Sequence, residues 1–418
     1  MVRKKLFFGL LLGGLAASLF AARAEAVPSF ARQTGLACAA CHTVFPELTA
    51  FGRSFKLNGY TLTGIKQVSA KESPAASGLQ FNQIPPLSAM LQVSGTYSKN
   101  QDPTSQVSLP DQLSFFFAGE ISPHMGSFIQ MTMEQGSGFS LDNTDIRYAN
   151  HAGKVTYGVT VNNSPTVQDL WNSTPAWGFP FTHGADIAAP VVADALAQNV
   201  AGVGGYADWG NGLYTELTLY RDTNPFDAPG GAESSPGVPQ AVRTRGLSPY
   251  VRVAWENNMS DGDSLMVGAY GMQTSTYAVD ATTGGGAGPA DKFKDAAIDT
   301  QYEHSFANSN NMLSVHASYT REKQTLDLSA PGDSPTLKSL RLDGTYHWGY
   351  HTTATLAYAQ NKGYNSAYDD KAWTAQVSYL PWQNTKFTLQ YVKYSKIGGQ
   401  TSNVSDNNTT LAQAWIMW

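Results

Sequence analysis

Cysteine is nearly absent from this 418-residue chain, which contains only Cys38 and Cys41. A scaffold of several disulfides is therefore excluded, and the two thiols must act within one short segment. Charged residues are also scarce, at 14% of the chain, and the formal net charge is −5. That charge is small and of the wrong sign for a nucleic-acid surface, so no nucleic-acid partner is expected.

Long apolar runs are missing except at the start of the chain. There, a basic beginning, an apolar stretch from Leu6 to Phe20 and a small-x-small site at residues 24–26 have the layout of an export signal. We expect residues 1–26 to be a cleaved signal peptide rather than a retained anchor. From Val27 onward no run approaches the roughly 20 apolar residues of a membrane-spanning helix. Any membrane span must therefore consist of strands.

Residues 87–418 have the period-two alternation of strands with one apolar and one polar face. The stretch 155–162, VTYGVTVN, places its valines and tyrosine on one face and its Thr, Gly and Asn on the other. Sixteen such segments begin near residues 87, 112, 125, 142, 153, 196, 211, 247, 262, 292, 311, 336, 352, 371, 385 and 409. The pattern predicts an all-β fold, a transmembrane antiparallel β-barrel of about 16 strands preceded by a small N-terminal segment.

The connections between these segments alternate long and short, as in outer-membrane barrels with short periplasmic turns and long external loops. The stretches 98–111, 163–195, 222–246 and 274–291 are long, and aromatic residues such as Trp209 and Trp348 lie at short turns. We expect the outer membrane of a Gram-negative bacterium, with the N-terminus in the periplasm or in the barrel lumen. A soluble, β-rich periplasmic cytochrome is the alternative.

The strongest motif in the chain is Cys38-Ala39-Ala40-Cys41-His42, which has the c-type haem attachment spacing. Two thiols at this spacing reach the two vinyl groups of a porphyrin, and the adjacent imidazole can ligate the iron. A thioredoxin-like redox pair or a structural disulfide would not need the histidine. We therefore expect one covalent haem c on Cys38 and Cys41, with His42 as axial ligand.

The residues around this motif resemble the fused monohaem cytochrome c–porins of the bacterial outer membrane. The resemblance is carried by PSFARQTG before the cysteines and FPELTAFGRSFKLNGYT after the histidine. It implies an electron carrier between an extracellular donor, such as Fe(II), and a periplasmic c-type cytochrome or other carrier. An Fe(II):cytochrome c oxidoreductase activity is implied as well.

Acidic residues in the long connections could then bind Fe(II) transiently as oxygen ligands. They are Asp169, Asp186, Asp194, Asp222, Asp227 and Glu233. The alternative function is a solute-diffusion porin in which the haem-bearing segment is a plug, a sensor or an adaptor.

The predicted domains are a haem segment at 27–66, a linker at 67–86 and the barrel at 87–418. Because so short a segment cannot bury a haem by itself, it must dock on the barrel. No His or Met lies between His42 and Met90, so the segment supplies no common sixth ligand.

In the first strand, Met90 shares a face with polar residues, so it should point into the lumen, while the opposite face contacts outer-membrane lipid. Met90 is therefore the first candidate for the sixth ligand. His316 is the second candidate, and Lys56 or Tyr60 would be weaker ligands.

Overall fold

The computed structural model describes residues 27–62, 85–178, 184–185, 187–227, 233–235, 238–239, 241–259, 262–279, 288–363 and 368–418. The expected signal peptide and nearly all of the expected linker lie outside these residues. No helix within the described ranges is long and apolar enough to span a membrane.

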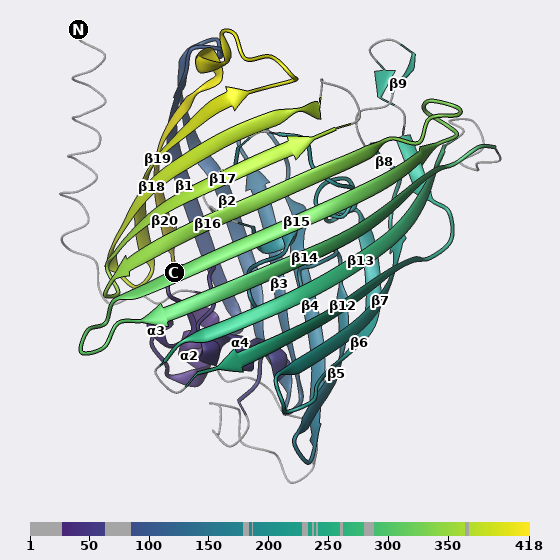
Figure 1. Ribbon diagram of the computed structural model, residues 1–418. Coiled ribbons are helices and arrows are strands. Elements are labelled where there is room, and N and C mark those ends of the chain that lie inside the picture. Colours follow the sequence, from purple (N-terminus) through teal and green to yellow (C-terminus); the bar gives the residue numbers. More distant parts are fainter. Residues whose placement is uncertain are drawn as a thin grey trace, which may run out of the picture.

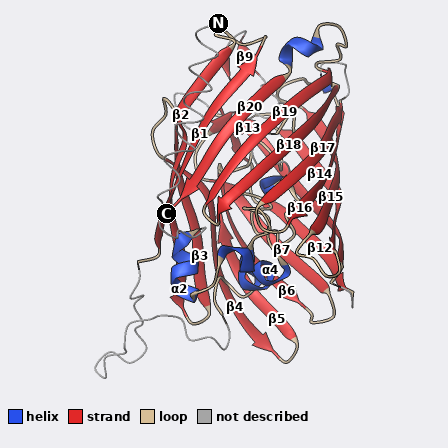
Figure 2. Cartoon of the chain, turned by 90° about the vertical axis from the view of Figure 1, so that its left-hand side faces the viewer, coloured by secondary structure: helices blue, strands red, loops and turns tan. Residues whose placement is uncertain are grey.

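Sixteen long antiparallel strands form a closed barrel (Figures 1 and 2). They are β1 (Leu87–Ser98), β2 (Ser105–Ser122), β3 (Met125–Glu134), β4 (Ser140–Ala152), β5 (Val155–Asn162), β6 (Val200–Asp208), β7 (Leu213–Asp222), β12 (Ser248–Asn258), β13 (Ser264–Ala278), β14 (Asp291–Ser305), β15 (Met312–Leu326), β16 (Thr336–Trp348), β17 (Thr352–Lys362), β18 (Asp370–Trp382), β19 (Thr385–Lys396) and β20 (Thr409–Met417). Strand β1 pairs with β2 and with β20, from Met90 opposite Met417 to Ser98 opposite Thr409, and this last pairing closes the sheet.

Fifteen of the sixteen strands begin within four residues of the predicted start, and the exception is β2. It begins at Ser105 instead of residue 112, because the strand continues through Pro110. The register between β1 and β2 shifts at this height, from Gln92 opposite Gln112 to Ser94 opposite Ser108. Proline is tolerated at such an irregularity, since the ladder hydrogen bond it cannot donate is already missing there.

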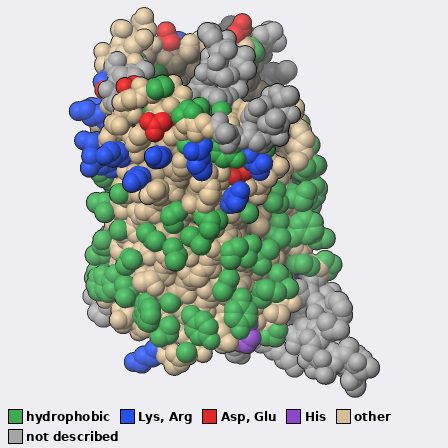
Figure 3. Space-filling model, turned by 90° about the vertical axis from the view of Figure 1, so that its right-hand side faces the viewer, with side chains coloured by type: hydrophobic (Ala, Val, Ile, Leu, Met, Phe, Trp, Pro, Cys, Tyr) green, Lys and Arg blue, Asp and Glu red, His purple; other side chains and the backbone are tan. Residues whose placement is uncertain are grey.

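The two faces of the barrel wall differ as predicted. In β5, Val159 is 46% exposed on the outside, whereas the neighbouring Thr160 is fully buried inside. Figure 3 shows apolar side chains covering the middle and lower part of one outer face. An apolar outer surface around a polar interior is what a barrel in a bilayer requires, and it places this chain in an outer membrane.

The ends of the barrel also differ as predicted. The short turns lie at one end, where Trp209, Trp348 and Tyr350 are about half exposed, as in an aromatic girdle. The helices of the N-terminal segment lie at this same end, and the long connections lie at the other (Figures 1 and 2). The long-loop end also carries short strands, which are β8 (Phe226–Asp227), β9 (Glu233–Ser235), β10 (Val238–Pro239) and β11 (Ala241–Thr244).

This arrangement predicts which loops are accessible on intact cells. An epitope tag inserted between Ala228 and Val238 will be labelled by antibody from outside, because the long connections face outward. A tag at the short turn after Asn257 and Asn258 will be labelled only after the outer membrane is opened. Labelling in the opposite order would show that the strand direction is reversed.

Candidate functional site

The N-terminal segment contains three short helices at the short-turn end of the barrel. They are α2 (Pro28–Thr34), α3 (Cys38–Cys41) and α4 (Ala50–Leu57). Pro28 lies in the first turn of α2, where its missing N–H costs nothing, and the helix ends at Gly35, whose φ of 70° suits glycine. The side chain of Thr49 caps α4 by accepting a hydrogen bond from the backbone N–H of Gly52, at 3.1 Å.

Ionic contacts fasten this segment to the barrel wall. The guanidinium of Arg53 on α4 contacts Glu303 through both oxygens, each at 2.9 Å, and Glu256 at 2.9 Å. The arginine side chain is only 4% exposed, and that of Glu303 only 8%. Further along the segment, Tyr60 donates a hydrogen bond to Asp145 at 2.7 Å. Charges this deeply buried persist only when paired, so the contacts fix where the segment docks.

The two cysteines lie one helical turn apart on α3, and they are not joined by a disulfide. Burial and the neighbouring Cys38 raise the pKa of Cys41 to about 11. Thioredoxin-like active sites differ, because the pKa of their reactive thiol is lowered. Gly52 lies against this turn, because a Cβ on it would come within 2.2 Å of the Cys41 carbonyl oxygen. Glycine is therefore required where α4 packs on α3.

The His42 ring is oriented by the chain itself. Its Nδ1 lies 3.2 Å from the backbone carbonyl oxygen of Glu47, which suits a tautomer with the proton on Nδ1. This leaves Nε2 as the atom with a free lone pair. Burial lowers the pKa of His42, which favours the neutral ring that can ligate a metal.

Glu47 connects this turn to the barrel wall. Its carboxylate is fully buried, accepts a hydrogen bond from Thr43 Oγ1 at 2.6 Å, and lies 3.7 Å from His316 and 3.5 Å from His347. His316 also contacts Asp343 at 3.2 Å. The second candidate ligand, His316, therefore faces Glu47 and Asp343 and is not among the residues that line the cavity beside His42.

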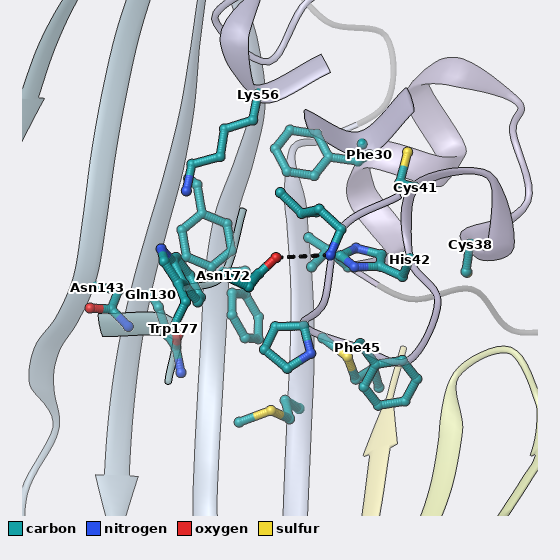
Figure 4. A pocket seen from close by; sticks show the side chains of 18 of the residues that line it. Phe30, Cys38, Cys41, His42, Phe45, Lys56, Gln130, Asn143, Asn172 and Trp177 are labelled. Atoms are coloured by element: carbon teal, nitrogen blue, oxygen red, sulfur yellow. Dashed lines mark hydrogen bonds between the residues drawn. The ribbon is translucent and has the colours of Figure 1, made fainter. Parts of the chain in front are cut away.

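A cavity of about 520 Å³ lies between the N-terminal segment and the inner wall of the barrel (Figure 4). Apolar and aromatic residues from both sides line it, together with a few amides. They include Phe30, Cys38, Cys41, His42, Phe45, Phe55, Met90, Phe116, Gln130, Asn172, Trp177 and Met417. Pockets that hold cofactors and other small molecules have volumes of roughly 300–1,000 Å³, so this cavity is of cofactor size.

Met90 lies on this cavity, as the phase of β1 predicts. It is 1% exposed and packs in one apolar cluster with Cys38, Phe45 and Met417. Its sulfur lies 3.5 Å from Nε2 of Gln92, which is a weak contact for a thioether. The structure thus places Met90 and His42 on the same cavity, while a bond from Met90 to iron stays a prediction.

The two weaker candidate ligands, Lys56 and Tyr60, also line this cavity, but their polar groups are held by other bonds. Lys56 Nζ donates to the carbonyl oxygens of Val167 and Asp169, at 2.6 and 2.7 Å, and lies 4.7 Å from the centre of the Trp177 ring. The Tyr60 hydroxyl is held by a barrel carboxylate. Either residue would have to break these bonds to reach a metal.

The expectation that residues 163–195 form an external loop is wrong for most of the described residues, which fold into the lumen. Asp169 is 1% exposed, and it pairs with Arg252 of the wall at 3.1 Å. Asn172 accepts a hydrogen bond from the backbone N–H of Leu48 at 3.0 Å (Figure 4). The loop therefore contacts the N-terminal segment directly and closes the outer side of the cavity.

The proposed acidic ligands for iron do not cluster in the described part of the chain. Asp169 forms an ion pair with Arg252, and Asp222 accepts a hydrogen bond from Arg243 at 2.7 Å. Asp186 lies outside the described residues. Among the residues that the structure describes, no group of three or more His, Cys, Asp and Glu side chains has the geometry of a metal site.

Three elements of the site were missed by sequence reasoning: Arg53, Glu47 and the inward loop with Asn172. Charged residues at inward strand positions, such as Arg252 and Glu303, were the available signal that buried partners existed. The identity of those partners had no local signature.

Among known proteins, similarity to this chain is found in solved structures of outer-membrane proteins, at low sequence identity. No family model and no curated protein matches the chain. Among solved structures it is similar to OmpF of Salmonella typhi, at 12% identity over 79% of this chain and 97% of that one, with a TM-score of 0.49. An anion-selective porin from Comamonas acidovorans is similar at 14% identity, 79% and 98% coverage and a TM-score of 0.48. OmpT of Vibrio cholerae follows at 10% identity, 79% and 98% coverage and 0.47.

Proposed function

We propose that this chain is an electron-transfer protein of the outer membrane, in which Cys38, Cys41 and His42 hold one covalent haem c inside the barrel. The observation that carries the proposal is the place of the attachment motif: it lines a cavity of about 520 Å³ between the docked segment and the lumen wall. The resemblance of residues 28–61 to fused cytochrome c–porins points to the same function.

The residues present fit a haem. Two thiols that form no disulfide and the His42 imidazole face a cavity of suitable size, and its lining is mainly apolar. When bound, haem iron cycles between its ferric and ferrous states and so accepts and releases one electron at a time. The chain itself excludes water with Phe30, Phe45 and Phe116, and it orients His42 through the Glu47 carbonyl.

The same segment is within reach from the periplasmic end. A second cavity of about 470 Å³ borders the other side of the motif, between residues 37–45 and the short turns that contain Tyr350 and Trp382. A periplasmic c-type cytochrome or similar carrier would approach here. The donor would act from the long-loop side, and Fe(II) is the donor that the resemblance implies. The net reaction is then the transfer of one electron from Fe(II) to the carrier.

Purified protein tests this proposal directly. Adding ferrous iron to the oxidised protein in detergent should produce the reduced α-band of a c-type haem, and an oxidised periplasmic-type cytochrome c should reverse it. The variant without both cysteines is the control and should show no band. A haem protein that stays oxidised with excess ferrous iron would contradict Fe(II) as the donor.

The porin-like barrel favours a second candidate, a solute-diffusion porin in which the haem segment is a plug, sensor or adaptor. The docked segment and the inward loop both lie in the lumen, so they would narrow the path of a solute through a porin of this kind. Conductance in planar bilayers separates the two functions. Steady ion current through the intact protein would favour the porin, and its absence together with haem reduction would favour electron transfer.

Met90 supplies a further prediction about the haem. Replacing Met90 with alanine should remove any far-red methionine–iron charge-transfer band and lower the midpoint potential, because a thioether ligand favours ferrous iron. The changes are measured by absorption spectroscopy and redox titration. Leu91→Ala, on the outward face of the same strand, is the matched control. An unchanged spectrum and potential would eliminate Met90 as a ligand.

A further inference from the structure

Lysine and arginine side chains gather on the outer surface of six neighbouring strands, β14 to β19, at the end with the long loops. Figure 3 shows a row of such side chains above the apolar belt on one face. Eight cations at outward positions make up this group, which we term the cationic belt. Its members are Lys292, Lys294, Arg321, Lys323, Lys338, Lys362, Lys371 and Lys393.

The strand register brings like charges together within the cationic belt. Lys294 is directly opposite Lys323, and Lys338 is directly opposite both Arg321 and Lys362. Directly opposite residues on one face have Cβ atoms only about 5 Å apart, and like charges in such pairs destabilise a sheet. Anions bound at the outer surface would relieve this repulsion.

Among the described carboxylates, Asp369 in the connection before β18 lies near Lys362 and Lys371, but its ion pair is with Lys396, outside the belt. All seven carboxylates within strands β14 to β19 are buried on the inner face of the barrel. They are Asp291, Asp295, Asp299, Glu303, Glu322, Asp343 and Asp370. In the part of the chain that the structure describes, no cation of the belt forms an ion pair. Cations outside and carboxylates inside cannot neutralise one another across the wall.

The cationic belt begins where the lipid-facing surface ends. On β14, Lys294 lies four residues from Ile298, which is 62% exposed, and on β16, Lys338 lies four residues from Leu342, which is 44% exposed. On β19, Lys393 is the next outward residue after Tyr391. These cations are therefore at the height of lipid headgroups, on the side of the membrane that the long loops face.

We propose that the cationic belt binds the phosphate groups of the glycolipid in the outer leaflet. The outer leaflet of such membranes is built of phosphorylated glycolipid, and a phosphate between two facing cations would turn their repulsion into a paired contact. Each Lys or Arg held near an anionic membrane surface contributes about a 5-fold gain in affinity. The lipid would thereby fix the height and rotation of the barrel in the membrane, independently of any haem.

Binding of lipid A tests the proposal. Titrating lipid A into the full-length protein in zwitterionic detergent should raise the unfolding temperature, and native mass spectrometry should show bound lipid. The double variant K323Q/K338Q should bind it about tenfold or more weakly, since it removes the facing cations. The matched control K99Q/K154Q changes two exposed lysines outside the belt and should bind as the wild type does. Added salt should weaken wild-type binding.

Three outcomes would overturn the proposal. The first is binding of dephosphorylated lipid A as tight as that of lipid A itself. The second is wild-type affinity in the K323Q/K338Q variant. The third is equal stabilisation by free inorganic phosphate at matching concentration. Without lipid, the variant should unfold at a temperature at least as high as the wild type, because it loses facing like charges. A lower value would contradict the repulsion. None of these measurements depends on haem, so a failure here and a failure of the electron-transfer proposal are distinguishable.

Discussion

Replacing both Cys38 and Cys41 with alanine will leave a folded barrel with no covalent haem. The two thiols are the only cysteines in the chain, so no other side chain can form the thioether bonds. The loss should be complete, because non-covalent haem is removed by denaturation and a thioether-linked haem is not. The pyridine haemochrome spectrum of denatured protein and the mass of the intact chain both measure it.

Two controls separate loss of attachment from loss of folding. The double variant should keep the circular dichroism of the β-barrel, because α3 contributes one helical turn and the sixteen strands pair without it. The single variant Cys41→Ala should keep at most one thioether bond and show a shifted haemochrome band. Covalent haem that persists in the double variant would refute the assignment of the motif.

The barrel strands were predictable because the environment differs on the two sides of the wall. Lipid outside and a polar lumen inside impose a period of two on every strand, and that period is legible in segments such as 155–162. The one large error, the start of β2, arose because residues 98–111 were taken as one long connection, whereas the strand begins at Ser105 and continues through Pro110. Proline cannot donate a hydrogen bond to the neighbouring strand. At a register shift that hydrogen bond is already absent, so proline does not end the strand there.

The inward loop was not predictable in the same way. Its sequence is as polar as that of an external loop, and only its partners distinguish the two. Asp169 is bound by Arg252, and Ser173 donates to Asp299 at 2.5 Å. These partners lie on strands far along the chain, so no local pattern could identify them. Buried polar groups need partners, but the sequence does not say which ones.

The candidate site divides along the same line. Cys38, Cys41 and His42 form a local motif whose spacing predicts haem attachment. The alternation of residues in one strand was enough to place Met90 on the lumen side. The role of Glu47 could not be predicted from the sequence, because its contacts with His316 and His347 depend on how the segment docks. Local chemistry was therefore predictable, whereas the support for that chemistry required the tertiary structure.

Arg53 is the residue whose loss should most disturb the docking of the haem segment. Arg53→Met keeps an apolar stem of similar length but leaves Glu303 buried without its cation, and Glu256 loses its partner as well. Breaking a buried ion pair on one side costs about 3–5 kcal/mol, so the segment should detach while the barrel remains closed. Limited proteolysis within residues 27–62 and current through planar bilayers would both increase. Urea titration followed by haem absorbance would show an earlier transition than titration followed by the β-sheet signal.

A second substitution, at Glu303, tests whether the ion pair is the cause of the detachment. The double variant Arg53→Met/Glu303→Gln removes the cation and the charge of its closest partner, so the buried uncompensated charge disappears and much of the docking should return. Arg221→Met, at an exposed position on β7, is the control and should change neither proteolysis nor current. Equal detachment in the single and double variants would show that apolar packing of the segment, rather than the ion pair, determines its position. Wild-type proteolysis and current in Arg53→Met would remove Arg53 from the docking contact altogether.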